Sequence, residues 1–198
     1  MSDPRVIVIG GSAGALDTLL AILPALPARF AIPVVVVVHL APNSASLVPA
    51  LLERATSLHV VEIEDKQPLM RATIHVAPPN YHVLLERDGT LALSIDELVH
   101  FSRPSIDVVF ESAARAFGGD VVAVLLSGAN EDGASGLRRI VEAGGLAFVQ
   151  DPSTAHHAIM PAAGIAELRG RGRILVPGRI AECLTGLVGD YAVAEHAR

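Results

Sequence analysis

The apolar residues of the chain are concentrated in short runs that end at glycine or polar residues. The runs 5–9, 33–38 and 121–126 contain almost no polar position, which is typical of central strands covered on both faces of a parallel sheet. Between them apolar residues recur at helical spacing, as do the leucines of segment 16–23, before Pro24 and Pro27. This alternation predicts an α/β fold: a doubly wound, mostly parallel, Rossmann-like sheet in three α/β/α layers.

The same spacings predict the later elements of the chain. Helices are expected through Leu47, Leu51, Leu52 and Ala55, over 106–117, over 137–143 and up to about Val188, and strands over 146–149 and 173–176. Residues 43–46, Asn-Ser-Ala-Ser, supply capping side chains for the first of these helices.

The middle of the chain has a different pattern, with four short strand candidates at 59–63, 73–77, 83–86 and 91–94. The last two are joined by Asp88-Gly89, a hairpin signal. We therefore expect a small antiparallel insert or edge in this region.

Composition narrows the class of protein. Of the 198 residues 51% are apolar, enough to bury the core of the single domain that we expect over 1–198. A net charge of −6, from 21 acids against 15 bases with no basic block, argues against a nucleic-acid partner. Cys183 has no second cysteine to pair with, and neither a signal peptide nor a membrane span of ~20 apolar residues is present. We expect a cytoplasmic protein that does not insert into membranes.

Three polar residues stand where apolar strands stop. Ser12 follows the first strand, His39 directly follows the second, and Asp132 lies in the loop after the strand at 121–126. Parallel strands place their C-terminal ends at one edge of a sheet, where ligands of open α/β folds bind. A serine, a histidine and an acid are the groups needed for nucleophilic acyl transfer. The sequence thus predicts a hydrolytic triad at this edge.

The glycines around Ser12 fit the same interpretation. Gly10-x-Ser12-x-Gly14 matches the pattern of a strained turn that presents a serine at a helix N-terminus. Backbone N–H groups near Ala13 could then hold a developing oxyanion, because the first amides of a helix lack internal partners. The order Ser, His, Asp differs from that of α/β-hydrolases, so that fold is not implied.

Other readings of these residues remain open. A strand, a glycine turn and a helix also begin a nucleotide-binding domain, but Ser12 stands where the fingerprint needs glycine, and His39 where it needs an acid. Taken singly, His39 and Asp132 could be a strand-end histidine and a turn or cap residue. A metal site at His156-His157 is disfavoured because no His-Glu-x-x-His or Cys/His ligand spacing is present.

A set of short blocks, in chain order from about Val6 to Leu187, resembles the CheB protein-glutamate methylesterase domain of bacterial chemosensory pathways. The blocks are Ile9–Gly14, Val37–Pro42, Val76–His82, Arg103–Asp107, Leu126–Ala134, Ala143–Gly145, Gln150–Pro152 and Met160–Pro161. The resemblance implies hydrolysis of glutamyl methyl esters on the helical cytoplasmic region of chemoreceptors, with deamidation of receptor glutamines in some members. No cofactor and no metal are implied.

The resemblance also implies roles for individual residues. By position Ser12 is the nucleophile, His39 the general base and Asp132 the residue that orients it. An amide at Ala13 or Ala129 would contact the oxyanion, and the cleft would include Gly11, His82 and the segment Arg103-Pro104-Ser105.

The chain departs from the family pattern in three respects. Ala13 replaces the usual Thr, and Ser127-Gly128-Ala129-Asn130 replaces the usual Thr-Gly-Met-Gly, so we expect an altered cleft and substrate preference. The segment between His39 and Val76 is compact. The chain also starts directly at the catalytic strand, so we expect no receiver domain and regulation, if any, by a separate receiver or signalling protein.

Two alternatives from other classes stay open. The triad determines the class of reaction, whereas the residues around the cleft determine the substrate. An esterase or amidase with another substrate therefore fits the sequence equally well. A non-catalytic binding or regulatory module of the same fold is disfavoured because all three triad residues are present.

Overall fold

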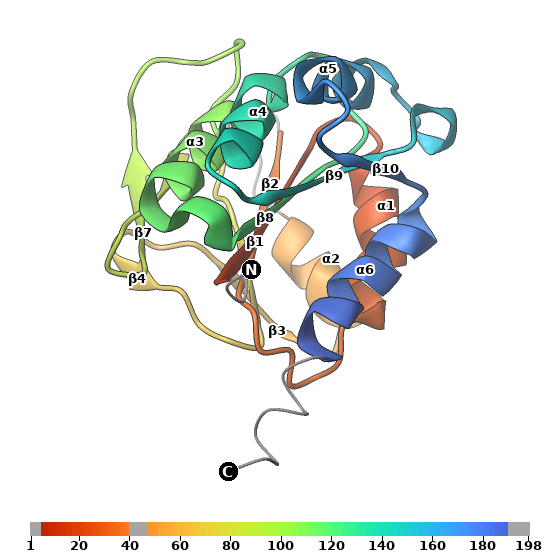
Figure 1. The fold of residues 1–198 in the computed structure, drawn as a ribbon. Coiled ribbons are helices and arrows are strands. Elements are labelled where there is room, and N and C mark those ends of the chain that lie inside the picture. Colours follow the sequence, from red (N-terminus) through yellow and green to blue (C-terminus); the bar gives the residue numbers. More distant parts are fainter. Residues whose placement is uncertain (1–4, 40–46, 190–198) are drawn as a thin grey trace.

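A computed structural model describes residues 5–39 and 47–189 of the chain. Its centre is a seven-stranded sheet of order β10-β9-β8-β1-β2-β5-β3 in which every neighbouring pair is parallel (Figure 1). The strands are β1 (Val6–Gly11), β2 (Val34–Val38), β3 (His59–Glu62), β5 (Thr73–Val76), β8 (Val121–Leu125), β9 (Leu146–Gln150) and β10 (Arg173–Leu175). The expected doubly wound α/β fold is confirmed.

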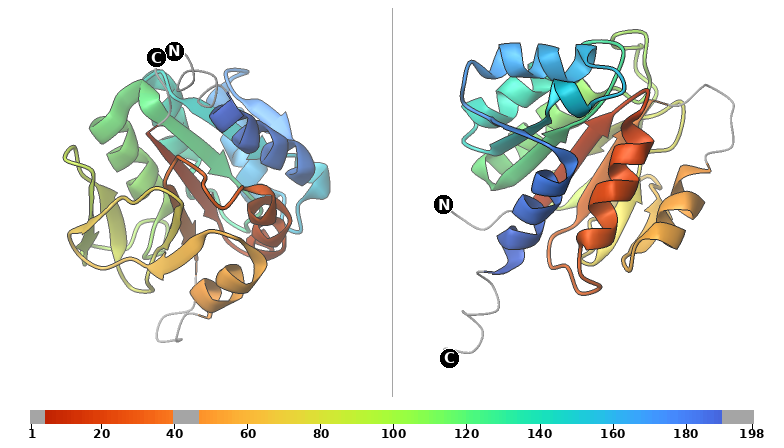
Figure 2. Two further views of the ribbon diagram at one scale, coloured as in Figure 1. Left: turned by 90° about the horizontal axis from the view of Figure 1, so that it is seen from below. Right: turned by 90° about the vertical axis from the view of Figure 1, so that its right-hand side faces the viewer.

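Helices cover both faces of this sheet (Figure 2). One face carries α1 (Ala15–Ile22), α2 (Val48–Ala55) and α6 (Pro177–Gly189), and the other α3 (Ile106–Phe117), α4 (Ala134–Glu142) and α5 (Ile159–Leu168). Side chains alternate along a strand, so Ile7 and Ile9 of β1 pack against the first layer. Val6 and Val8 pack against the second. Both faces of β1 are therefore apolar, which explains the unbroken apolar run in the sequence.

A second, antiparallel sheet has the order β4-β7-β6 and packs beside α3. Its strands are β4 (Gln67–Pro68), β6 (His82–Leu85) and β7 (Thr90–Ser94). The expected antiparallel element is thus present, but the expectation that it included 59–63 and 73–77 was wrong. These segments form β3 and β5 of the large sheet, and all four residues of β5 are buried.

Three helices differ from the sequence expectation. Helix α5 was not predicted, because its ten residues are apolar almost all round and include Pro161 and Gly164, which hides the helical period. Helix α4 starts at Ala134 rather than 137. Helix α2 has Leu47 at its N-cap, and the capping residues expected at 43–46 lie outside the described residues.

The order of the strands creates a switch point. The chain adds β2, β5 and β3 on one side of β1 and β8, β9 and β10 on the other. The loops after β1 and β8 therefore lead to helices on opposite faces of the sheet. Ligands of open α/β folds bind at such a switch point, at the C-terminal edge of the strands. Within the described ranges, no helix is long and apolar enough to cross a membrane.

Candidate active site

Ser12 sits in the tight turn between β1 and α1. Its backbone N–H donates to Ser127 O (2.9 Å), and its own carbonyl accepts from Ala15 N–H (3.0 Å). Gly14 has φ 78°, and a Cβ there would lie 2.4 Å from His156 Cβ, so the turn requires glycine at this position. The result is a half-buried serine held at the start of a helix.

Strand register brings His39 beside Ser12. Gly11 pairs with Val38 in the parallel ladder of β1 and β2, so Ser12 and His39 are the next residues on neighbouring strands, which lie about 4.8 Å apart. The N–H of His39 also donates to Gly11 O (3.2 Å). No hydrogen bond joins the Ser12 hydroxyl to a residue in the ranges 5–39 and 47–189.

His39 and Asp132 are in direct contact. His39 Nε2 lies 2.8 Å from Asp132 Oδ2, and the side chains are 12% and 0% exposed. The second ring nitrogen, Nδ1, lies 3.4 Å from Ser102 Oγ. Because a carboxylate only accepts, Nε2 carries the proton toward Asp132, and Nδ1 is the acceptor available for chemistry.

Asp132 is held by four donors. Oδ1 accepts from the Ser105 hydroxyl (2.8 Å) and Asp107 N–H (3.0 Å), and Oδ2 accepts from Ile106 N–H (2.7 Å) as well as from His39. Three of these donors come from the first residues of α3 and its N-cap Ser105. A helix N-terminus favours negative charge, so the carboxylate is fixed both in place and in charge.

These contacts decide the protonation of Asp132. Burial alone would raise its pKa, but the hydrogen bond from His39 and those from Ile106 and Asp107 N–H together lower the pKa below its ordinary value. The acid is therefore ionised throughout the neutral range, as a residue that orients an imidazole must be.

Two oxyanion donors are expected, Ala13 in the Ser12 turn and Ala129 in the loop after β8. Ala13 and Ala129 are both exposed, and neither backbone N–H donates to another residue of the described chain. Unpaired amides of this kind can receive a negative oxygen. Gly11, by contrast, ends β1 and contributes its carbonyl to His39 rather than a donor to the cleft.

A buried polar network that sequence reasoning missed braces this turn. The Ser127 hydroxyl donates to Ala13 O (2.8 Å), and its backbone N–H donates to Gln150 Oε1 (2.9 Å). Gln150 is 1% exposed and also donates to Thr154 O (3.1 Å). The only available signal was a glutamine at the end of an apolar strand.

His82 and Arg103 lie around the site without touching Ser12. His82 is buried; its Nδ1 accepts from Ser105 N–H (3.1 Å), and its Nε2 contacts Glu97 O (2.9 Å). Arg103 donates to Ile95 O (2.7 Å) and Asp96 O (3.0 Å). Both residues hold the loop before α3, so their place is in the scaffold of the cleft.

A second histidine–aspartate pair lies next to Asp132. His100 Nε2 is 3.3 Å from Asp107 Oδ2, and Asp107 Oδ1 accepts from Gly136 N–H (2.6 Å). Burial and, to a lesser extent, the neighbouring charge of Asp132 raise the pKa of Asp107 to about 6, while the hydrogen bond from Gly136 N–H opposes them.

Ligand atoms of His100, Asp107 and Asp132 all lie within 4.8 Å of one another, close enough to hold a metal ion. Asp132, however, already accepts four hydrogen bonds, which fill its acceptor sites. Of this described cluster, the exposed His100 and the buried Asp107 could then offer ligands, and two are too few for a closed metal site.

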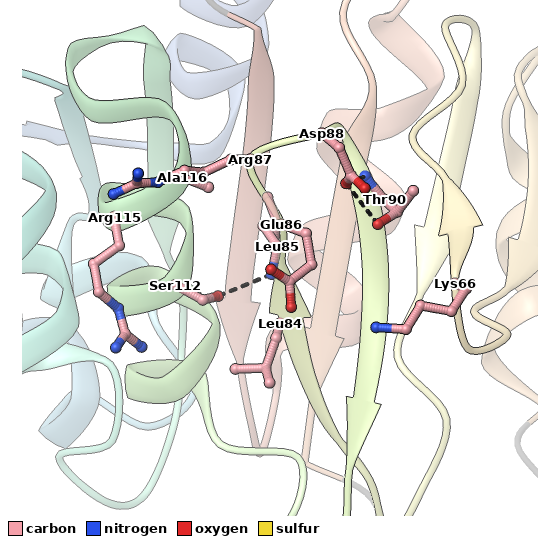
Figure 3. Close-up of a pocket in the computed structure, with 10 residues that line it drawn as sticks. All are labelled: Lys66, Leu84, Leu85, Glu86, Arg87, Asp88, Thr90, Ser112, Arg115 and Ala116. Atoms are coloured by element: carbon pink, nitrogen blue, oxygen red, sulfur yellow. Dashed lines mark hydrogen bonds between the residues drawn. The ribbon is translucent and has the colours of Figure 1, made fainter.

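A larger hollow lies elsewhere in the described part of the chain. It measures about 800 Å³ and is lined by the antiparallel sheet with its loops and by α3, among them Lys66, Glu86, Arg87, Ser112 and Arg115 (Figure 3). Arg115 stands ten residues after the N-cap of α3, which at 1.5 Å per residue is roughly 15 Å from Asp132. Its charges have mixed sign, and no candidate nucleophile pairs with a base there.

Comparisons with known proteins agree on one family. A family model described as CheB methylesterase matches residues 7–184. A protein of Leptospira interrogans named "Putative protein-glutamate methylesterase/protein-glutamine glutaminase" is 48% identical over 161 residues, 81% of this chain and 83% of that protein. A protein-glutamate methylesterase/protein-glutamine glutaminase of Nitrosospira multiformis is 34% identical over 96% of this chain, which spans 53% of that protein.

A solved structure agrees as well. The crystal structure of the Thermotoga maritima CheB methylesterase catalytic domain superposes with a TM-score of 0.88 at 29% identity. The match covers 94% of this chain and 100% of the crystallised domain.

Proposed function

The chain belongs to the CheB methylesterase family, and from this premise we propose that it is a serine hydrolase that demethylates glutamyl methyl esters on chemoreceptors. Ser12 is the nucleophile, His39 the general base and Asp132 the acid that orients it. The observation that carries the proposal is the 2.8 Å contact of His39 with Asp132 beside the Ser12 turn.

The proposed reaction has two halves. Ser12 Oγ attacks the ester carbonyl carbon while His39 takes the hydroxyl proton, and Asp132 stabilises the charged imidazole. The N–H groups of Ala13 and Ala129 hold the oxyanion. Methanol leaves with the proton, and water attacks the acyl-serine with His39 again as base, which yields glutamate and free Ser12. All of these groups come from the chain itself.

The same chemistry accounts for deamidation. If the acyl donor is a glutamine side chain, ammonia replaces methanol as the leaving group and the same acyl-serine forms. The relatives' names pair the two activities, and we extend both to this chain. Because the receptor region concerned is helical and cytoplasmic, the proposal places the hydrolase in the cytoplasm, with a separate receiver or signalling protein as its regulator.

One experiment tests the function. Wild type, Ser12→Ala and the control Ser57→Ala, an exposed serine before β3, are incubated with a methyl-labelled chemoreceptor fragment and with a generic small ester. We expect labelled methanol from wild type and Ser57→Ala only. Release from the small ester alone would favour an esterase with another substrate, and release that survives Ser12→Ala would refute the nucleophile.

A further inference from the structure

A small hollow of about 110 Å³ borders His39 on the side of its second ring nitrogen. It is lined by His39, Asn80, Leu98, Ser102 and Pro104, among others. Ser102 Oγ lies 3.4 Å from His39 Nδ1, so the nitrogen that does not face Asp132 faces the serine that lines this hollow. We propose that the hollow receives the leaving group of the ester or amide, and this inference rests on the function proposed above.

Proton transfer requires the leaving group to be next to that nitrogen. The base that takes the Ser12 proton must return it to the departing oxygen or nitrogen as the C–O or C–N bond breaks. Nε2 is committed to Asp132, so the transfer uses Nδ1. The alcohol or ammonia therefore forms beside Ser102, and after it departs the same space admits the attacking water, whose proton moves to Nδ1.

The lining suits a small, partly polar group. Ser102 adds a hydroxyl, which donates to His100 O (3.3 Å), and half-buried Asn80 adds an amide whose backbone is fixed by its N–H bond to Arg103 O (3.1 Å). Leu98 and Pro104 add apolar surface for a methyl group. A water occupies about 30 Å³, so 110 Å³ holds roughly three or four water-sized groups. Methanol or ammonia fits, and a benzyl alcohol does not.

Hydrogen bonds fix the loop that forms this hollow. Val99 and Ser102 exchange backbone hydrogen bonds across a turn (3.2 and 2.9 Å), and Arg103 ties the loop to Ile95 O and Asp96 O. The position of the Ser102 hydroxyl is therefore set by the loop, and the size of the hollow can be changed by side-chain substitution.

A series of peptides that carry one γ-glutamyl methyl, ethyl, propyl or benzyl ester tests the inference. Wild type, Ser102→Leu, Leu98→Ala and the exposed control Ser57→Leu are compared by kcat/KM for each ester. For wild type and the control we expect at least a tenfold fall from methyl to benzyl. Leu98→Ala, which widens the hollow, should reduce this ratio at least threefold, and Ser102→Leu, which fills it, should lower methyl-ester turnover at least tenfold.

The outcomes separate the two proposals. Equal kcat/KM for all four esters, or unchanged preferences in both variants, would overturn the leaving-group site while Ser12-dependent hydrolysis still stood. Absence of Ser12-dependent release from every ester would overturn the hydrolase itself. Circular dichroism and thermal melting check that Ser102→Leu is folded. Leu98→Ala alters a side chain that is 57% exposed, so the Leu98→Ala result decides between the outcomes if Ser102→Leu fails to fold.

Discussion

Replacing Asp107 by Asn is expected to stabilise the protein at neutral pH. Asp107 is 6% exposed and lies beside a second buried carboxylate, Asp132. An asparagine can keep the hydrogen bond from Gly136 N–H through Oδ1 and can donate to His100 through Nδ2. The substitution therefore removes a buried charge and keeps the shape and most contacts of the side chain.

The magnitude follows from the pKa of Asp107. Burial raises this pKa from 3.8 to about 6, so the folded chain binds the proton more tightly than the unfolded chain. At about 1.4 kcal/mol per pH unit the charged form costs up to about 3 kcal/mol. The folded state holds this proton between pH ~4 and ~6 while the unfolded state has lost it, so stability falls as pH rises through that window and is constant above it.

Urea unfolding of wild type and Asp107→Asn between pH 4 and 8 measures the effect. The difference in unfolding free energy should grow from near zero at pH 4 to between 1 and about 3 kcal/mol above pH 6, in favour of the variant. Asp96→Asn, at an exposed position before α3, is the control and should run parallel to wild type. Parallel curves for Asp107→Asn as well would refute the reasoning.

Three further predictions concern the same architecture. Asp132→Asn should lower turnover roughly 10³- to 10⁴-fold, because the amide cannot accept from both His39 and the α3 amides. It should also lower the free energy of unfolding by about 1–3 kcal/mol. Steady-state kinetics and urea unfolding measure the two effects, and unchanged turnover would argue against the role of Asp132. Burial lowers the pKa of His75, whose Nε2 accepts from Met70 N–H. The stability that this group contributes is therefore complete above pH ~6.5 and is lost as pH falls below that value, by at most about 1.4 kcal/mol per pH unit. In thermal melts from pH 7.5 to 5, His75→Gln should lose less stability on acidification than wild type, and an equal loss would contradict the assignment. Gly14→Ala should lower the free energy of unfolding in urea more than Gly89→Ala does. Both glycines have positive φ, but of the two only Gly14 would place a Cβ against another side chain, that of His156. Equal losses would show that the His156 contact is unimportant.

The fold and the three polar strand ends could be predicted because both depend on local signals. An apolar run of five or six residues defines a buried strand wherever it pairs, and a residue that ends such a run lies at the sheet edge. Pairing itself is long-range: nothing local shows that Thr73–Val76 inserts between β2 and β3, so its parallel pairing was missed. Helix α5 was missed because a helix buried on most sides has no polar face.

The environment of Asp132 shows the same limit. Two of its four donors are backbone N–H groups of Ile106 and Asp107. Almost every residue has such an N–H group, so the residue type does not indicate which ones bind a carboxylate. The Asp107–His100 pair was missed because its two members are separated by a loop whose path only the structure gives. Contacts between side chains across a loop, like backbone hydrogen-bond donors, cannot be predicted from the sequence without the conformation of the loop.

The N-terminus of α3 couples the acid to the substrate side of the site. Ser105, Ile106 and Asp107 hold Asp132, while Ser102, three residues before Ser105, reaches His39 Nδ1. One short segment therefore contacts both ends of the His39–Asp132 pair. A ligand that shifted the loop before α3 would change the orientation of the acid and the proposed leaving-group hollow together, because His82 contacts both Glu97 O in that loop and Ser105 N–H.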